Sequence, residues 1–249
     1  MARRGGDKLF KKAKEKRDFM RTINNRYKRG NIIIACEDSV SSPAYFKIMI
    51  DQLIKEKKIT PDSIVIVAHD GATHPTGVLD NLKNYKDESG RKYSDFDYKW
   101  IVIDRDIEKV NGAGHTTEDF NNALKNTKHR INKFHIDIAY ANDSFELWYL
   151  LHFEYRNTAI LRDEIILQVI KRLKEIDRHK FAKSTKDNIK QENYTKLIFE
   201  TLKPLQNVAV QNAKKLLASH GEGHNPESDN PSTTIHSLVI LLNSLFNNN

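Results

Sequence analysis

Two aspartates, Asp104 and Asp106, stand directly after a run of β-branched and aromatic residues at positions 100–103, which predicts a short strand buried on both faces. Side chains two positions apart on an extended chain project to the same side, so both carboxylates are expected together at the carboxyl end of this strand. Ligands of open parallel sheets bind at that edge. Two like charges held this close require a cation or a base between them. The alternative is a strand that ends in an acidic turn, with Arg105 as the partner of the acids.

Polar residues also follow the other three predicted strands. Glu37 follows the first strand and His69 the second, while Asn142 and Glu146 follow the fourth. Asn142 and Glu146 are four positions apart, which predicts that they share one face of a helix. Because the carboxyl ends of parallel strands meet at one edge, these side chains are expected near the aspartate pair. An all-oxygen cluster favours Mg²⁺ or Mn²⁺, and such a site supports phosphoryl transfer best.

Each of these residues also has a purely structural interpretation. Glu37 could complement the dipole of the helix that follows it. Glu146 could point outward on an amphipathic helix, and His69 is better explained as a loop histidine than as a ligand. The convergence of acids after successive strands favours the site over the structural interpretations.

The elements that must position these side chains alternate along the chain. Strands are predicted at residues 31–36, 63–68, 100–103 and 134–140, and helices at 42–57, 77–85, 116–128 and 145–153. Four strands that alternate with helices predict a three-layer α/β fold, in which a four-stranded parallel sheet with right-handed crossovers is flanked by helices.

The pattern changes at about residue 155. No further strand is predicted, and helices are expected near 160–177, 190–202, 204–219 and 232–246. The expected organisation is a basic N-terminal arm at 1–29, an α/β domain at 30–155 and an all-helical C-terminal extension at 156–249.

Positive charge is concentrated at the N-terminus. Residues 1–30 hold 12 Lys and Arg against 3 acids, so the net charge of +8 leaves about −1 for residues 31–249. Basic arms are common on proteins that contact nucleic-acid phosphates, and a solubilising tail is the alternative. Nucleic acid, RNA or DNA, is therefore the expected partner.

Composition excludes several other classes. A single cysteine, Cys36, rules out a disulfide framework and a cysteine-rich zinc site. No apolar run approaches the roughly 20 residues that span a bilayer, and the N-terminus lacks the apolar segment of a signal peptide. We therefore expect a cytoplasmic protein with no membrane partner. No GxxxxGK[ST] phosphate loop is present, so the chain is not itself a P-loop ATPase.

A strand that ends in Glu37 and a later strand that ends in Asp104-x-Asp106 resemble the Toprim pattern of topoisomerases, primases and OLD-type nucleases. Over roughly residues 30–245 the chain is more narrowly similar to the RloB-like family of prokaryotic Toprim proteins. The segments that carry the resemblance are Ile33-Ile-Ala-Cys-Glu37, Pro43-x-Tyr45-Phe46, Trp100-Ile-Val-Ile-Asp-Arg-Asp106, Asn142-x-x-Phe145-Glu146-Leu-Trp148, Leu150-Leu-His152-Phe153, Tyr194-x-Lys196, Asn212-Ala-Lys214 and Asn230-Pro-Ser-Thr-Thr234.

The resemblance implies a metal site and assigns its ligands. Glu37, Asp104 and Asp106 would bind Mg²⁺ or Mn²⁺, with Glu37 also available as a general acid or base. Glu146 would complete or orient the ligand shell. The family usually has a glycine after the glutamate and an acid several residues later, where this chain has Asp38 and Ser42. The extra carboxylate either compensates for the missing acid or alters the site.

Further residues are candidates for contacts with the substrate. Lys196 is a candidate for the scissile phosphate, and a solvated surface lysine is the alternative. Arg105, His69 and Asn142 are candidate substrate-binding residues, together with the basic arm.

The resemblance therefore predicts a metal-dependent Toprim nuclease that acts in a prokaryotic anti-phage or restriction-linked defence system. RNA such as tRNA is the expected substrate class. Family members are often paired with an ATPase of the ABC/SMC type, so such a partner is expected, and a homo-oligomer is compatible with the pattern. The rival prediction is a non-catalytic subunit that docks onto that ATPase. A primase-like or topoisomerase-like activity is disfavoured, because no tyrosine-nucleophile domain or zinc-binding segment is recognisable.

Overall fold

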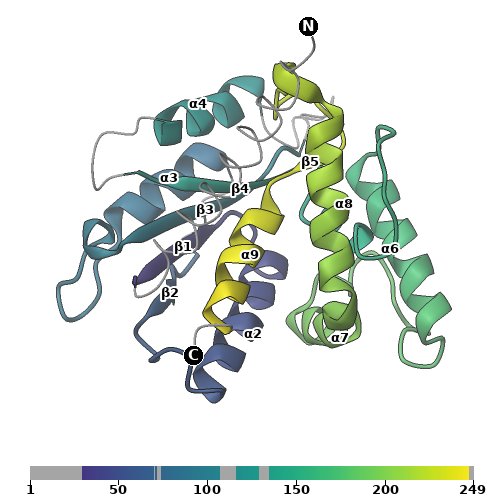
Figure 1. Ribbon diagram of the computed structural model, residues 1–249, viewed down its shortest axis with the longest axis horizontal. Coiled ribbons are helices and arrows are strands. Elements are labelled where there is room, and N and C mark those ends of the chain that lie inside the picture. The colour runs from purple at the N-terminus through teal and green to yellow at the C-terminus, as the bar shows by residue number, and fades with distance from the viewer. Residues whose placement is uncertain (1–29, 70, 72–73, 107–115, 129–134, 247–249) are drawn as a thin grey trace, which may run out of the picture.

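The computed structural model describes residues 30–69, 71, 74–106, 116–128 and 135–246, so the predicted basic arm lies outside the described residues. The fold is built on a five-stranded sheet in the order β2-β1-β3-β4-β5 (Figure 1). The strands β1 (Ile32–Cys36), β2 (Ile64–Ile66), β3 (Tyr98–Asp104) and β4 (Asp137–Asn142) are parallel, as predicted. The last strand, β5 (Ser232–Thr233), was not predicted and runs antiparallel to β4.

Helices cover both faces of the sheet (Figure 1). The helices α3 (Pro75–Asn84) and α4 (Thr117–Lys128) lie on one face, and α2 (Ser41–Lys55) and α9 (Ile235–Phe246) lie on the other. The short α5 (Glu146–Leu150) follows β4, and α6 (Arg162–Ile176), α7 (Glu192–Leu202) and α8 (Gln206–Ser219) form the C-terminal helical region. Within the described part of the chain, no helix has both the length and the apolar character needed to span a bilayer.

Alternation along β1 explains the three layers. Ile33 and Ala35 pack into the core under α3 and α4, whereas Ile32, Ile34 and Cys36 pack into the larger core under α2. Successive side chains of a strand point to opposite faces, so a strand that is apolar at every position is buried on both sides. The uninterrupted apolar run therefore correctly predicted a strand that is covered on both faces of the sheet.

The C-terminal region departs from the all-helical prediction at β5. Ser232 and Thr233 pair with Asn142 and Ala141 of β4, and the Thr233 hydroxyl donates to the Tyr140 carbonyl oxygen at 2.7 Å. Two polar residues show no apolar alternation, so the sequence pattern contained no signal for this strand. The chain then enters α9, which packs against β4 and α2. The segment after residue 155 thus contributes one strand and one helix to the sheet layers.

The strand register decides which residues share the carboxyl edge. Cys36 lies opposite Val102, and the Glu37 backbone amide donates to the Val102 carbonyl oxygen at 2.9 Å. Asn142 is the last residue of β4, whereas Glu146 is the first residue of α5. The prediction that Asn142 and Glu146 share a helical face was therefore wrong, because the strand extends two residues further than its apolar run.

Candidate metal centre at the carboxyl edge of the sheet

Glu37 and Asp104 are neighbours at the carboxyl ends of β1 and β3. The Asp104 backbone amide donates to Glu37 Oε2 at 2.9 Å, although 67 residues separate the two in the chain. Both residues are buried, with 9% of Glu37 and 7% of Asp104 exposed. The parallel pairing of β1 and β3 places the two acids side by side, because each one follows or ends its strand at the same level of the sheet.

Arg162 binds both aspartates of the Asp-x-Asp pair. Its Nη2 lies 3.2 Å from Asp104 Oδ2, and its Nη1 lies 2.5 Å from Asp106 Oδ2. Arg162 is the first residue of α6, and its backbone amide donates to Asp143 Oδ2 at 2.9 Å. Arg105, which the alternative interpretation made the partner of the two acids, lies 3.1 Å from Glu227 instead.

No motif in the sequence pointed to Arg162 as a residue of this site. Its one local signal was an arginine at the start of a predicted helix, where the helix dipole disfavours a cation. A cation at that place is explained by the four carboxylates around it, those of Asp104, Glu146, Asp106 and Asp143.

Electrostatics at this edge favour a bound positive charge. Burial raises the pKa of Asp104 well above its usual value, and the negative charges of Glu37 and Glu146 raise it further, while Arg162 opposes the rise. Burial by itself would lower the pKa of Arg162, but the surrounding carboxylates raise it above its ordinary value. The crowding of carboxylates around Asp104 is thus relieved either by a proton on Asp104 or by a bound cation.

Glu146 belongs to the same buried cluster. Only 3% of this residue is exposed, and its Oε2 accepts a hydrogen bond from the Ser144 hydroxyl at 2.7 Å. The alternative in which Glu146 points outward on an amphipathic helix is therefore excluded. Its charge acts on both Asp104 and Arg162, which places a third acidic segment beside the ends of β1 and β3.

The arrangement fits a hard divalent cation. Every candidate ligand is a carboxylate, and Mg²⁺ and Mn²⁺ prefer oxygen ligands. Asp106 Oδ1 is buried and has no hydrogen-bond partner among the described residues, so a buried carboxylate oxygen remains available. Glu37, Asp104, Asp106 and Glu146 are the residues that would hold the ion, with Arg162 competing for the two aspartates.

Asp38 does not serve as a surplus ligand in this structure. Its Oδ1 accepts from the Val40 backbone amide at 2.8 Å and its Oδ2 from the Ser42 amide at 2.9 Å. The carboxylate therefore satisfies amides at the start of α2 that have no partner within the helix. Its negative charge still raises the pKa of Asp104, and this is the smallest of the contributions to that pKa.

Arg105 and Asn142 hold a loop rather than facing open solvent. Arg105 Nη2 lies 3.1 Å from Glu227 Oε1, and its Nε donates to the Glu227 carbonyl oxygen at 3.2 Å. Asn142 Nδ2 donates to the Pro226 and Glu227 carbonyl oxygens, both at 3.2 Å. The segment between α8 and β5 is thereby fastened beside the carboxylates. The substrate-binding roles of both residues stay predictions.

His69 uses both ring nitrogens within the protein. Its Nε2 lies 2.9 Å from the Glu37 carbonyl oxygen, and its Nδ1 accepts from the Gly71 amide at 3.0 Å. Because a carbonyl oxygen only accepts, Nε2 must carry the proton. The structure therefore supports the loop-histidine alternative, in which His69 positions the chain after Glu37.

Lys196 belongs to a groove whose lining includes none of the four candidate metal ligands. It is exposed on α7 and lines a groove between α2 and α7 together with Lys47. A larger cavity of about 760 Å³ opens next to Glu37, and its lining includes Cys36, Asp38 and His69. The two chain neighbours of Glu37 line this cavity, whereas the four candidate ligands Glu37, Asp104, Asp106 and Glu146 are absent from its lining and from that of the groove.

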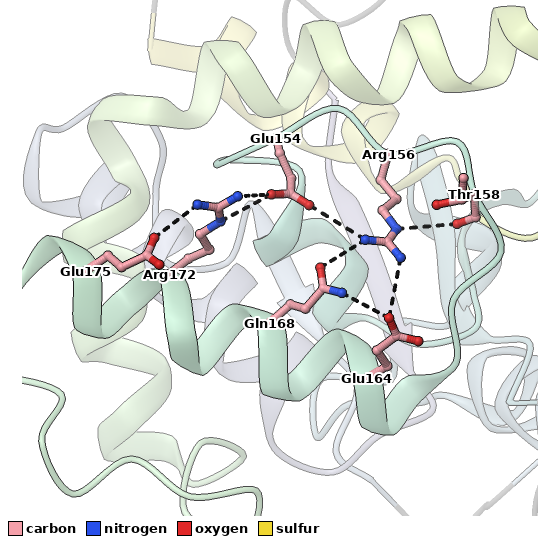
Figure 2. A network of polar contacts seen from close by, with 7 residues as sticks. All are labelled: Glu154, Arg156, Thr158, Glu164, Gln168, Arg172 and Glu175. Carbon is pink, nitrogen blue, oxygen red and sulfur yellow. Dashed lines mark hydrogen bonds and ion pairs between the residues drawn. The ribbon is translucent and has the colours of Figure 1, made fainter.

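Further along α6, charged residues form a separate surface network (Figure 2). Arg172 binds Glu154 and lies 3.0 Å from Glu175, while Arg156 lies 3.4 Å from Glu164. Figure 2 shows these side chains joined between α6 and the segment that carries Glu154, Arg156 and Thr158, and none of the labelled residues is a candidate ligand. Arg162 therefore differs from the other arginines of this helix region by its contact with the buried acids.

Comparisons with known proteins identify a family but no close relative. A family model described as RloB-like protein matches residues 32–242. No curated protein matches the chain, and no solved structure matches it.

Proposed function

The chain belongs to the RloB-like family, and from this membership together with the carboxylate cluster we propose that it is a divalent-metal-dependent nuclease of the Toprim type. The observation that carries the proposal is the convergence of Glu37 with Asp104 and Asp106, three acids that come from two strands and meet at one edge of the sheet. Arg162 stands in contact with both aspartates, which supports the need for a cation there.

The chain's own residues would perform three tasks. Asp104 and Asp106 would hold the ion, and Glu146 would orient the ligand shell from the start of α5. Glu37 would accept or supply a proton at the oxygen that attacks or leaves the phosphorus. When bound, Mg²⁺ would stabilise the developing charge on the phosphate and position an attacking oxygen.

Nucleic acid is the proposed substrate, and RNA such as tRNA within a prokaryotic defence system is the finer proposal. It rests on the family resemblance and on the basic residues 1–30. The proposed metal is Mg²⁺ or Mn²⁺. An ATPase of the ABC/SMC type is the proposed partner.

The test compares the wild-type chain with Glu37→Gln and Asp104→Asn on tRNA, other RNA and DNA in the presence of Mg²⁺. Both variants are expected to lose cleavage, whereas the exposed control Glu175→Gln keeps it. The same series is scored for growth arrest on expression, which Glu37→Gln is expected to relieve. Cleavage that survives both substitutions would overturn the metal-site assignment.

The rival function is a non-catalytic subunit that docks onto the ATPase. Two large apolar side chains of α6, Leu167 and Ile176, are half exposed, and exposed apolar side chains are frequent at docking surfaces. Copurification of an ATPase, with no cleavage by the resulting complex, would favour this function over the nuclease.

A further inference from the structure

Two histidines and an aspartate converge between α8 and β5, apart from the carboxylate cluster. His220 caps α8, His224 follows the short turn η4 (Gly221–Gly223), and Asp229 precedes β5. Asp229 Oδ2 lies 2.7 Å from His224 Nδ1 and 3.6 Å from His220 Nδ1. One ligand atom from each residue lies within 4.8 Å of the others.

The Nε2 atom of each histidine, which lies on the side of the ring away from Asp229, has a hydrogen-bond partner of its own. His220 Nε2 lies 3.0 Å from the Pro231 carbonyl oxygen, and His224 Nε2 lies 2.6 Å from the Tyr140 hydroxyl. Metal-binding histidines commonly have the ring nitrogen opposite the metal fixed in this way, by a carbonyl or another polar group. Both Nδ1 atoms are thereby directed toward the carboxylate of Asp229.

The hydrogen bond from His220 Nε2 leaves two acceptor atoms facing each other, Nδ1 of the neutral His220 ring and Oδ2 of Asp229. A carbonyl oxygen only accepts, so Nε2 of His220 must donate to Pro231 and, in the neutral ring, Nδ1 presents a lone pair. That lone pair faces Asp229 Oδ2 at 3.6 Å, an arrangement that a cation between the two atoms would stabilise, and Oδ2 also accepts from the Asn225 backbone amide at 2.8 Å. The two imidazoles stack with their centroids 5.3 Å apart, and both Nδ1 atoms lie on the side of Asp229.

We propose that His220, His224 and Asp229 bind a Zn²⁺ ion through the two Nδ1 atoms and Oδ2. Zinc is a borderline cation that takes imidazole nitrogen and carboxylate oxygen at about 2.0–2.2 Å in tetrahedral geometry. Ligand atoms at tetrahedral angles are about 3.3 Å apart, so the 2.7 Å contact opens and the 3.6 Å contact closes by a few tenths of an ångström. Water takes the fourth position. Mg²⁺ is a poorer match, because it prefers an all-oxygen shell.

The bound ion fastens the segment that reaches the carboxylate cluster. The loop between His220 and Asp229 includes Glu227, which binds Arg105 directly after Asp104 in the chain. It also supplies the carbonyl oxygens that accept from Asn142. Zinc at its base therefore acts as a structural clamp. This inference stands independently of the proposed nuclease activity, because it uses none of the acids of that site.

The test titrates Co²⁺, a spectroscopic substitute for Zn²⁺, into the untagged full chain after removal of metals with a chelator. We expect about one ion per chain, visible absorption of the four-coordinate type, and displacement by Zn²⁺. His220→Gln and Asp229→Asn should lose the absorption. The exposed histidine variant His179→Gln and the variant Glu37→Gln should keep it. Tyr140→Phe retains the ring but lacks the hydroxyl that holds His224, so it should weaken binding about 10- to 100-fold.

Circular dichroism and the melting temperature of each metal-free variant show whether the loss of binding reflects unfolding. If His220→Gln fails to fold, the proposal is tested by the other two variants: Asp229→Asn should lose the Co²⁺ absorption and Tyr140→Phe should bind Co²⁺ more weakly. Wild-type protein that gives no four-coordinate spectrum would overturn the proposal, and so would binding that is lost in Glu37→Gln but kept in Asp229→Asn. The His220–Asp229 contact would then be an ion pair of a protonated ring.

Discussion

Replacing Arg162 with glutamine tests whether the guanidinium occupies the place of a divalent cation. The substitution removes the contacts to Asp104 and Asp106 and leaves these buried carboxylates beside Glu37 and Glu146. Breaking a buried ion pair from one side typically costs about 3–5 kcal/mol. The Arg162 side chain is 21% exposed, so we expect a loss of about 2–4 kcal/mol in the free energy of unfolding without divalent cations.

Magnesium should restore much of this loss. A ligand that binds only the folded state adds about 2.7 kcal/mol to stability at a concentration of 100 times its dissociation constant. With Arg162 removed, the aspartates no longer have a competing cation, so Mg²⁺ should stabilise Arg162→Gln more than it stabilises the wild type. For a chain of this length, each 1 kcal/mol shifts the melting temperature by about 2–4 °C.

The assay is urea unfolding, with thermal melts in parallel, in EDTA and in millimolar Mg²⁺. Arg172→Gln is the matched control, because Arg172 lies on the same helix and binds Glu154 and Glu175 at the surface (Figure 2). With 42% of its side chain exposed, its removal should cost less than about 1 kcal/mol and should not respond to Mg²⁺. A loss in Arg162→Gln no larger than that of the control, or equal effects of Mg²⁺ on both variants, would refute the reasoning.

Three further predictions concern stability. The pKa values of His152 and His236 are lowered to about 4 by burial, so an unfolded chain takes up protons that the folded chain does not as the pH falls from 6.5 to 4. The free energy of unfolding, measured in urea, should fall over that window by up to about 1.4 kcal/mol per pH unit for each group, and His152→Gln should flatten the slope. Asp38→Ala removes the acceptor for two backbone amides at the start of α2 and should cost about 0.5–2 kcal/mol by the same measurement, and an unchanged midpoint would contradict this. Thr233→Val deletes the hydroxyl that donates to Tyr140, leaves a buried carbonyl with one bond fewer, and should lower stability by about 1–3 kcal/mol, whereas no change would show that β5 is held by its backbone pairing alone.

Local patterns in the sequence predicted the parallel part of the sheet well. The apolar runs that became β1, β3 and β4 are buried on both faces, and strand burial leaves a continuous apolar signature that needs no knowledge of the partner strand. The positions of Glu37 and Asp104 at one edge followed from that pattern, because parallel strands present their carboxyl ends together. The metal-binding and catalytic roles of these residues stay predictions.

Contacts between distant polar segments could not be predicted in the same way. Ser232 and Thr233 become a strand only because β4 offers them a free edge, and their own side chains are too polar to show a strand pattern. His220, His224 and Asp229 looked like loop residues, since a spacing of this kind gains meaning only when the loop folds back on itself.

The sequence by itself determined the four parallel strands, the helices that alternate with them and the acids at the strand ends, because hydrophobic periodicity and residue type are properties of short segments. Only the tertiary structure decided that Arg162 binds both aspartates and that Arg105, their neighbour in the chain, binds Glu227 instead. The physical reason is that the interaction between charges depends on distance in space, and the packing of α6 against α5 brings together groups that lie more than 50 residues apart in the chain.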